Sequence, residues 1–145
     1  MNDEHDRACV GELIKNIGAA VYPVGRLDMY TEGLLILTND GDVANKIMHP
    51  SANISKIYHL KIKGEATDEI ITKLRLPIEI DGKKTLPAEV SIISADEKST
   101  KIRVALREGR NRQVRRMCEE AGIKLAKLKR VSIGEIKLGE LRVGE

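Results

Sequence analysis

The sequence predicts a single α+β domain, and three observations favour that fold class. Its 145 residues are enough for one domain with a hydrophobic core of its own. Short segments with alternating or continuous apolar residues, typical of strands, recur between turn signals. Fewer segments carry apolar residues at helical spacing. Many short strands with a few helices indicate a mixed, mostly antiparallel sheet flanked by helices.

Four segments have the spacing of amphipathic helices. They are residues 9–17, residues 42–48 before Pro50, a segment that begins after Thr67, and residues 111–121. Thr67 is a typical helix cap, because its hydroxyl can accept a hydrogen bond from a free backbone N–H. The residues expected to face inward in the last three helices are Val43, Ala44, Ile47, Met48, Ile70, Ile71, Leu74, Val114, Met117, Cys118 and Ala121.

Other segments have the pattern of strands. Residues 33–38 form a short continuous apolar run, which indicates a buried strand. Residues 56–63 alternate, which puts Tyr58 on the same inner face as Leu60 and Ile62. The remaining expectations are strands at 88–94 and 101–106 with a turn near Asp96, strands and turns over 125–143, and a hairpin turn at Asp81-Gly82.

The charges are unevenly distributed along the chain. The whole sequence has 25 basic and 22 acidic residues, yet the segment from Lys101 to Arg130 holds eleven basic and three acidic ones. A mildly acidic body with one basic segment fits a surface that meets a polyanion, although most charge runs are only solvated faces. Aromatic residues are few, so any base stacking depends on Tyr22, Tyr30 or Tyr58.

Membrane, secreted and metal-binding classes are disfavoured. No apolar run approaches the roughly 20 residues of a membrane-spanning helix, and the polar, acidic N-terminus has no apolar secretory core. We therefore expect a soluble protein with no membrane partner, cytoplasmic by default. Cys9 and Cys118 lie far apart and the three histidines are scattered, so no metal cluster is visible and both thiols are expected to be buried or half-buried.

Asp28 precedes the run at 33–38, and loops beside rigid buried strands are where catalytic groups are commonly mounted. It could be a nucleophile or a base, although from spacing alone a turn or helix-cap role is more common. Asp28 with Glu32 also has the pattern of a paired-carboxylate, glycoside-cleaving site. That alternative leaves the arginine-rich segment unexplained, so we keep it as the weakest of the alternatives.

The arginine-rich segment leads into the last expected helix. Residues 109–112, which include Arg110 and Arg112, would put cations and backbone N–H groups at a helix N-terminus, an arrangement that favours phosphate. Arg115 lies one turn further, close to the apolar stripe, and a partly buried guanidinium needs a carboxylate partner. Asp28 is a candidate for that partner, and the pairing would keep the aspartate ionised.

Several of these segments together resemble the Rsu-type ribosomal pseudouridine synthases. The most specific is GRLDMYTEGLLILTNDG at residues 25–41. KIY at 56–58 resembles the family's second motif, a Lys-x-Tyr on a strand, and EGRNRQVRRM at 108–117 resembles its third. LKRVSIG at 128–134 and LGEL at 138–141 fit the family's ending. The resemblance covers the chain from about residue 5 to residue 145, with all motifs in order.

The resemblance implies an RNA-uridine isomerase that acts on ribosomal RNA and needs no cofactor or metal. Asp28 would be the catalytic aspartate, which attacks the sugar or removes a sugar proton, and Arg115 would pair with it. Tyr58 would pack on the uracil and assist proton removal from carbon 5, while Arg26 would fill the gap that the extruded base leaves. The further residues expected to bind RNA are Lys56, Arg110, Arg112 and Arg116.

The chain also departs from that family's usual plan. Members usually begin with a small RNA-binding domain, a linker and a first core strand, and the sequence of residues 1–145 has the pattern of none of these. We therefore expect residues 1–145 to be the catalytic domain alone, with an exposed sheet edge that favours a homodimer. The alternative to an active isomerase is an RNA-binding remnant that keeps the fold but has lost activity.

Overall fold

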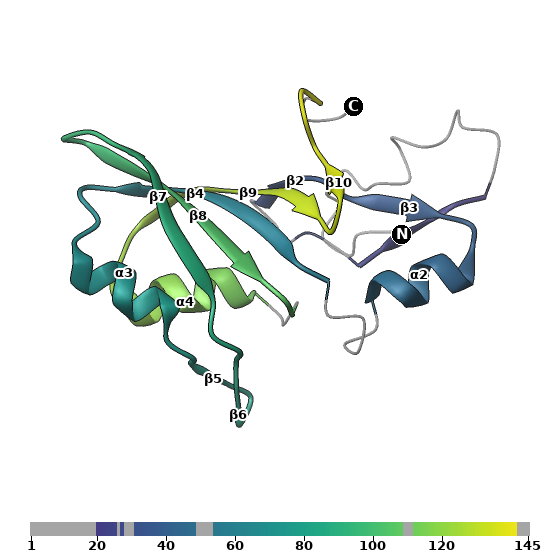
Figure 1. Ribbon diagram of the computed structural model, residues 1–145, viewed down its shortest axis with the longest axis horizontal. Helices are drawn as coiled ribbons and strands as arrows, with labels where there is room; N and C mark the ends of the chain where they lie inside the picture. The colour runs from purple at the N-terminus through teal and green to yellow at the C-terminus, as the bar shows by residue number, and fades with distance from the viewer. Residues whose placement is uncertain (1–19, 26, 28–30, 49–53, 109–111, 142–145) are drawn as a thin grey trace, which may run out of the picture.

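The computed structural model describes residues 20–25, 27, 31–48, 54–108 and 112–141 (Figure 1). The helix expected over 9–17 lies outside these ranges. In chain order the described elements are β1 (Tyr22–Val24), β2 (Thr31–Gly33), β3 (Ile36–Thr38), α2 (Gly41–Met48), β4 (Lys56–Lys63), α3 (Asp68–Arg75), β5 (Glu79–Ile80), β6 (Lys83–Lys84), β7 (Glu89–Ala95), β8 (Ser99–Leu106), α4 (Gln113–Ala121), β9 (Leu125–Ile133) and β10 (Ile136–Lys137).

A six-stranded sheet organises the molecule. Its strands follow the order β10-β9-β4-β8-β7, and β2 also pairs with β9. β4 runs antiparallel along one side of β9, so β2 and β10 share the other side. Within the described part of this sheet only the β2–β9 pairing is parallel. The predicted α+β class with a mixed, mostly antiparallel sheet is therefore confirmed.

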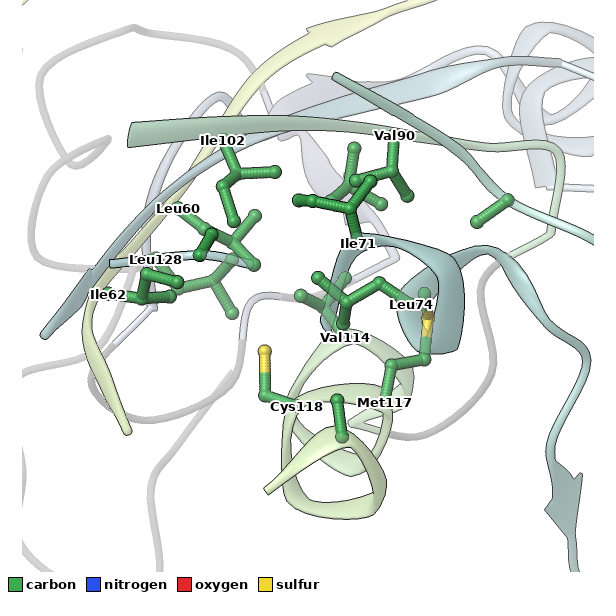
Figure 2. Close-up of a cluster of buried hydrophobic side chains, with 14 of the residues drawn as sticks. Leu60, Ile62, Ile71, Leu74, Val90, Ile102, Val114, Met117, Cys118 and Leu128 are labelled. Carbon is green, nitrogen blue, oxygen red and sulfur yellow. The ribbon is translucent and has the colours of Figure 1, made fainter. Parts of the chain in front are cut away.

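The main hydrophobic core lies between this sheet and the helices α3 and α4, which cover the same face (Figure 1). Alternate residues of each strand point towards the helices, because strand side chains alternate between the two faces. Figure 2 shows these side chains meeting: Leu60 and Ile62 from β4, Ile102 from β8, Leu128 from β9, Ile71 and Leu74 from α3, and Val114, Met117 and Cys118 from α4.

Local signals in the sequence set the helix ends. The Thr67 hydroxyl accepts a hydrogen bond of 3.3 Å from the Ile70 N–H at the start of α3, as predicted. Before α2, the Asp40 carboxylate accepts a bond of 2.9 Å from the Asp42 N–H. α4 ends at Ala121 and is capped by Gly122, whose left-handed φ of 73° lets its N–H donate back to the last turn of the helix.

The predicted strand at 33–38 is wrong as a single element. β2 ends at Gly33, and β3 instead forms a separate two-stranded sheet with β1. The break has a physical cause: the φ of Gly33 is 120°, and Leu34 then turns into a second, smaller core with Ile133 and Leu138. The continuous apolar run is therefore divided between two short strands, β2, which pairs with β9, and β3, which pairs with β1.

The prediction of which α2 residues face inward is correct for two of the four residues. Ala44 is buried and Ile47 packs against the second core, but Val43 and Met48 are 42% and 57% exposed. α2 lies beside the small β1–β3 sheet at one end of the molecule (Figure 1), so only a narrow stripe of the helix is covered.

The other predicted elements are confirmed. β4 occupies the predicted range, β5 and β6 meet at the Asp81-Gly82 turn, and Asp96 sits between β7 and β8. Cys118 is buried as expected, and burial raises the pKa of its thiol to about 12. Cys9 lies outside the described residues. Within the described ranges, no helix combines the length and the apolar content that a membrane crossing requires.

Replacing Ile62 by alanine should lower the free energy of unfolding by about 2–5 kcal/mol, because this side chain is fully buried and its loss leaves a cavity. Urea denaturation followed by circular dichroism measures the change. Ile93→Ala is the matched control, since Ile93 is 48% exposed on β7 and should cost far less. Equal losses in the two variants would contradict the assigned core.

Candidate active site

A cleft of about 510 Å³ opens where β4 begins, β8 ends and α4 begins. Four of its lining side chains are cationic: Lys56, Arg112, Arg115 and Arg130. None of the described residues that line it is acidic. A concave site with this charge attracts anions, because the cations reinforce one another and the surrounding protein screens them less than water does.

Arg115 joins the first turn of α4 to β2. Its Nη2 donates a hydrogen bond of 3.1 Å to the Thr31 hydroxyl. Its Nε is buried and meets no acceptor among the described residues. A buried guanidinium N–H without an acceptor is costly, so this geometry suits an anionic oxygen beside Arg115.

Arg130 enters the cleft from β9 and is only 5% exposed. Its Nε donates to the Leu34 carbonyl at 2.9 Å, and the Leu34 N–H donates to the Arg130 carbonyl at 2.8 Å. Its Nη2 is buried and finds no acceptor in the part of the chain that the structure describes. Gly33 allows this approach, because a Cβ at that position would overlap the Arg130 backbone.

Lys56 and Tyr58 line the cleft from the first half of β4. Burial, and then the charge of Arg130, lower the pKa of the Lys56 ammonium. Tyr58 lies directly opposite Arg130 on the β4–β9 ladder and is half-buried against the main core. The cleft therefore presents an aromatic ring next to fixed cations, which suits a planar ring carried by an anionic chain.

Arg112 stands at the rim, immediately before α4. Its φ of 53° lies in the left-handed region, which is uncommon for a residue other than glycine, and its exposed side chain makes no capping bond. The start of α4 is anchored elsewhere: Gln113 Nε2 donates to Glu108 Oε1 at 2.9 Å, and the same oxygen accepts the Leu86 N–H at 2.9 Å. Arg112 lines the cleft without taking part in these bonds.

Three of the site residues predicted from the sequence lie outside the described residues: Arg26, Asp28 and Arg110. The residues that adjoin segment 28–30 on either side, Leu27 and Thr31, both line the cleft. The chain therefore enters and leaves that segment at the cleft.

Two predicted features are not brought to the cleft. Arg116 faces the β5–β6 turn, where its Nη1 lies 3.9 Å from an Asp81 carboxylate oxygen, and it does not line the cleft. Glu32 pairs with Lys127 at 2.9 Å, whereas its neighbour Thr31 lines the cleft. Because adjacent strand residues point to opposite faces, Glu32 is directed away from the cleft and the paired-carboxylate alternative loses its support.

Arg130 is the functional candidate to which sequence reasoning assigned no role. The alternation of β9 gives a partial signal, since Arg130 shares the inward face with Leu128. An arginine in such a series is commonly an edge residue with a solvated head. Its burial depends on pairings with distant segments, since β2 and β4 flank β9 at Arg130.

The described residues contain no group of three or more His, Cys, Asp or Glu side chains that could hold a metal ion. The expected absence of a metal or cofactor remains a prediction. What the cleft offers is electrostatic: fixed cations and buried N–H donors able to bind a carboxylate, a phosphate or developing negative charge.

Comparison with known proteins identifies the family. Residues 14–120 match the RNA pseudouridylate synthase family. The chain is 47% identical over 130 residues to the ribosomal large subunit pseudouridine synthase B of Bacillus subtilis (strain 168), covering 88% of this chain and 53% of that one. It is 40% identical over 130 residues to an uncharacterised RNA pseudouridine synthase of Aquifex aeolicus (strain VF5), covering 90% of this chain and 52% of that one. The chain thus spans about half the length of these relatives.

Solved structures agree. A crystal structure of a pseudouridylate synthase superposes with a TM-score of 0.76 at 31% identity, covering 86% of this chain and 54% of that one. An H/ACA ribonucleoprotein bound to a substrate RNA shares the fold at 15% identity, with a TM-score of 0.65 and coverage of 90% and 43%. These matches confirm both the expected fold and the resemblance of the motifs, and the chain belongs to the RNA pseudouridylate synthase family.

Proposed function

We propose that this chain is the catalytic part of an enzyme that isomerises a specific uridine of ribosomal RNA to pseudouridine, with Asp28 as the catalytic carboxylate. One observation carries the assignment of Asp28. Leu27 and Thr31, the described residues on either side of Asp28, both line the cleft in which Arg115 and Arg130 hold buried donors without described acceptors. The similarity to a ribosomal large subunit pseudouridine synthase suggests the reaction and the class of RNA.

The proposed reaction moves one bond within a single nucleotide. Asp28 attacks the sugar or removes a sugar proton, and the bond from the ribose to uracil nitrogen 1 breaks. The freed uracil rotates and carbon 5 joins the sugar, as the Asp28–sugar bond breaks or Asp28 returns the sugar proton. Carbon 5 then loses its proton, and nitrogen 1 gains one. Nothing is oxidised or reduced, so the chemistry asks for no redox cofactor. The uridine has to leave the RNA stack first, as for other base-modifying enzymes.

The remaining site residues take supporting roles in this proposal. Tyr58 packs on the uracil and assists proton removal from carbon 5, and Arg115 holds Asp28 ionised and oriented. Arg130 offers its free Nη2 to the same carboxylate or to the flanking phosphate. The residues proposed to hold the RNA around the extruded uridine are Lys56, Arg112, Arg26 and Arg110.

The domain assignment is also a proposal. We assign residues 1–145 to the catalytic domain, and the family's small N-terminal RNA-binding domain to no part of them. Two findings support this: the family match runs over residues 14–120, and most described elements contribute to the sheet or to the helices that pack on it.

Replacing Asp28 by alanine should reduce the reaction to background, a loss of about 10⁴-fold or more, because nothing else in the proposal can open the bond to nitrogen 1. The measurement is tritium release from ribosomal RNA labelled at uridine carbon 5. Asp28→Asn, which keeps the shape and removes the charge, should lose activity equally. Release that survives in Asp28→Ala would remove Asp28 from the mechanism. If the wild-type chain bound RNA without any release, the inactive RNA-binding alternative would replace this proposal.

Replacing Arg115 by lysine should slow tritium release by about a hundredfold, because lysine keeps the charge but loses the fork that orients its partners. Arg116→Lys is the matched control on the adjacent residue. Arg116 faces Asp81 outside the cleft, so this variant should keep the wild-type rate. Equal losses in both variants would indicate damage to α4 rather than a specific role of Arg115.

The expected homodimer belongs to this proposal too. β7 is an edge of the described sheet and carries the exposed residues Ile92 and Ile93. Edge strands with exposed apolar residues are prone to pair with a second chain.

Light scattering should therefore give a molar mass that rises towards the dimer with concentration. Ile93→Lys should lower the mass, while Ile136→Lys, on β10 at the opposite side of the sheet, should not. A clean monomer at every concentration would exclude self-association.

A further inference from the structure

The face of the sheet that points away from α3 and α4, here called the open face, is strongly basic. In the described part of the chain no helix covers it (Figure 1). Its side chains alternate with the inward residues of the main core. Six of them, the open-face cluster, are exposed or half-buried: Lys127 and Lys129 of β9, His59 and Lys61 of β4, and Lys101 and Arg103 of β8.

The strand register arranges the open-face cluster in two rows. Lys129, His59 and Arg103 lie directly opposite one another across the three strands. The second row, formed in the same way, contains Lys127, Lys61 and Lys101. Neighbours within a row are separated by about 4.8 Å, the distance between strands, and the rows by about 6.6 Å, two residues along a strand. All six neighbouring positions therefore hold a basic side chain.

Acidic contacts only partly offset this charge. Among the described contacts, Glu32 pairs with Lys127 at 2.9 Å. Asp96 lies at one end, where N–H bonds from Ser99 and Lys98, and more weakly the charge of Lys61, lower its pKa. These two carboxylates face five Lys and Arg side chains in the open-face cluster.

The pKa of His59 is lowered from its usual value. Burial lowers this pKa first, and the charges of Arg103, Lys129 and Lys101 lower it further. The charged groups that act on the imidazole are cations, which repel an added proton.

Folding does not explain the open-face cluster. Like charges directly opposite one another destabilise a sheet, and the core on the other face needs only the inward residues. Uncharged polar residues at these positions would form the same strands without that repulsion. A partner with closely spaced negative charges would offset the repulsion among these cations and would be attracted to them.

We propose that the open face binds the sugar–phosphate backbone of a double-stranded RNA segment, separate from the strand that enters the cleft. This inference rests on the proposed function, which supplies RNA as the partner. The cleft residues Tyr58, Leu128 and Arg130 belong to the inward face of the same strands, so one thickness of sheet separates the two surfaces. The bound duplex is therefore a different segment of the RNA from the one that carries the target uridine.

The composition of the open face favours a duplex over unpaired bases. Single strands are usually held by aromatic side chains on which bases stack, and the open-face cluster contains none of the chain's Tyr residues. Duplex RNA is recognised chiefly through its phosphates, its 2′-hydroxyls and its shape. Lysine and arginine in rows suit that mode, which should be independent of sequence and sensitive to salt.

The test uses the double variant Lys61→Gln/Lys101→Gln and a fluorescently labelled 20-base-pair RNA duplex of arbitrary sequence. The plot of log affinity against log KCl concentration has a negative slope. Removing two phosphate contacts should make that slope less steep, by about 2. The matched control is Lys73→Gln/Lys84→Gln, which removes the same charge away from the open face and should leave the slope close to wild type. The stability of Lys61→Gln/Lys101→Gln in urea should equal or exceed that of the wild type, since repulsion is relieved.

Tritium release separates this inference from the proposed function. With labelled ribosomal RNA, Lys61→Gln/Lys101→Gln should raise KM and leave kcat unchanged, because the cleft is intact. If the wild-type chain released no tritium, the proposed function would be rejected. The duplex titration would still test binding to the open face. Equal slopes for the test and control pairs would overturn the inference, as would binding to anionic phospholipid vesicles without binding to the duplex.

His59 gives an independent signal by nuclear magnetic resonance. A bound polyanion offsets the surrounding cations, so the pKa of His59 should rise when the duplex is added, and the rise should disappear at high salt. A His59 pKa that does not move at saturating duplex would also overturn the inference.

Discussion

The close contact between Gly33 and Arg130 is the constraint on which the rest of the site depends. β2 can run beside β9 only because residue 33 has no side chain, and the reciprocal bonds between Leu34 and Arg130 then fix the two segments. The same contact lets the Arg130 guanidinium donate to the Leu34 carbonyl, and it places Thr31, two residues before Gly33, within reach of Arg115. One close backbone approach therefore positions two cations of the cleft.

These cations are held in place before any ligand arrives. Arg115 and Arg130 each keep a buried donor without an acceptor among the described residues, and Lys56 loses proton affinity through burial and the nearby Arg130. Such an arrangement costs free energy in the folded protein, and a bound anion recovers that free energy. Electrostatic catalysis requires hydrogen-bond donors that are already fixed around the place where negative charge develops. The protein then has little left to reorganise during the reaction.

The sequence predicted the elements that depend on local signals and missed features that depend on distant contacts. The alternation over 56–63, Thr67 and Gly122 act within a few residues, so β4, α3 and the end of α4 were predictable. The division of 33–38 and the burial of Arg130 depend on segments almost a hundred residues apart. In the site, family motifs led to Tyr58 and Arg115, which the structure places at the cleft. The choice between Arg115 and Arg116 depends on the rotation of α4, about 100° per residue.

The basic segment from Lys101 to Arg130 illustrates why net charge alone is a weak guide. Strand alternation and helix rotation divide it between two surfaces that can do different physical work. Buried cations such as Arg130 are little screened, have one position and act at contact distance, so they can orient a reacting group. Exposed cations such as Lys61 are mobile and act within a Debye length of about 8–10 Å, so they can attract and hold a polyanion without fixing its register. The fold, rather than the total charge, separates orientation in the cleft from attraction on the open face.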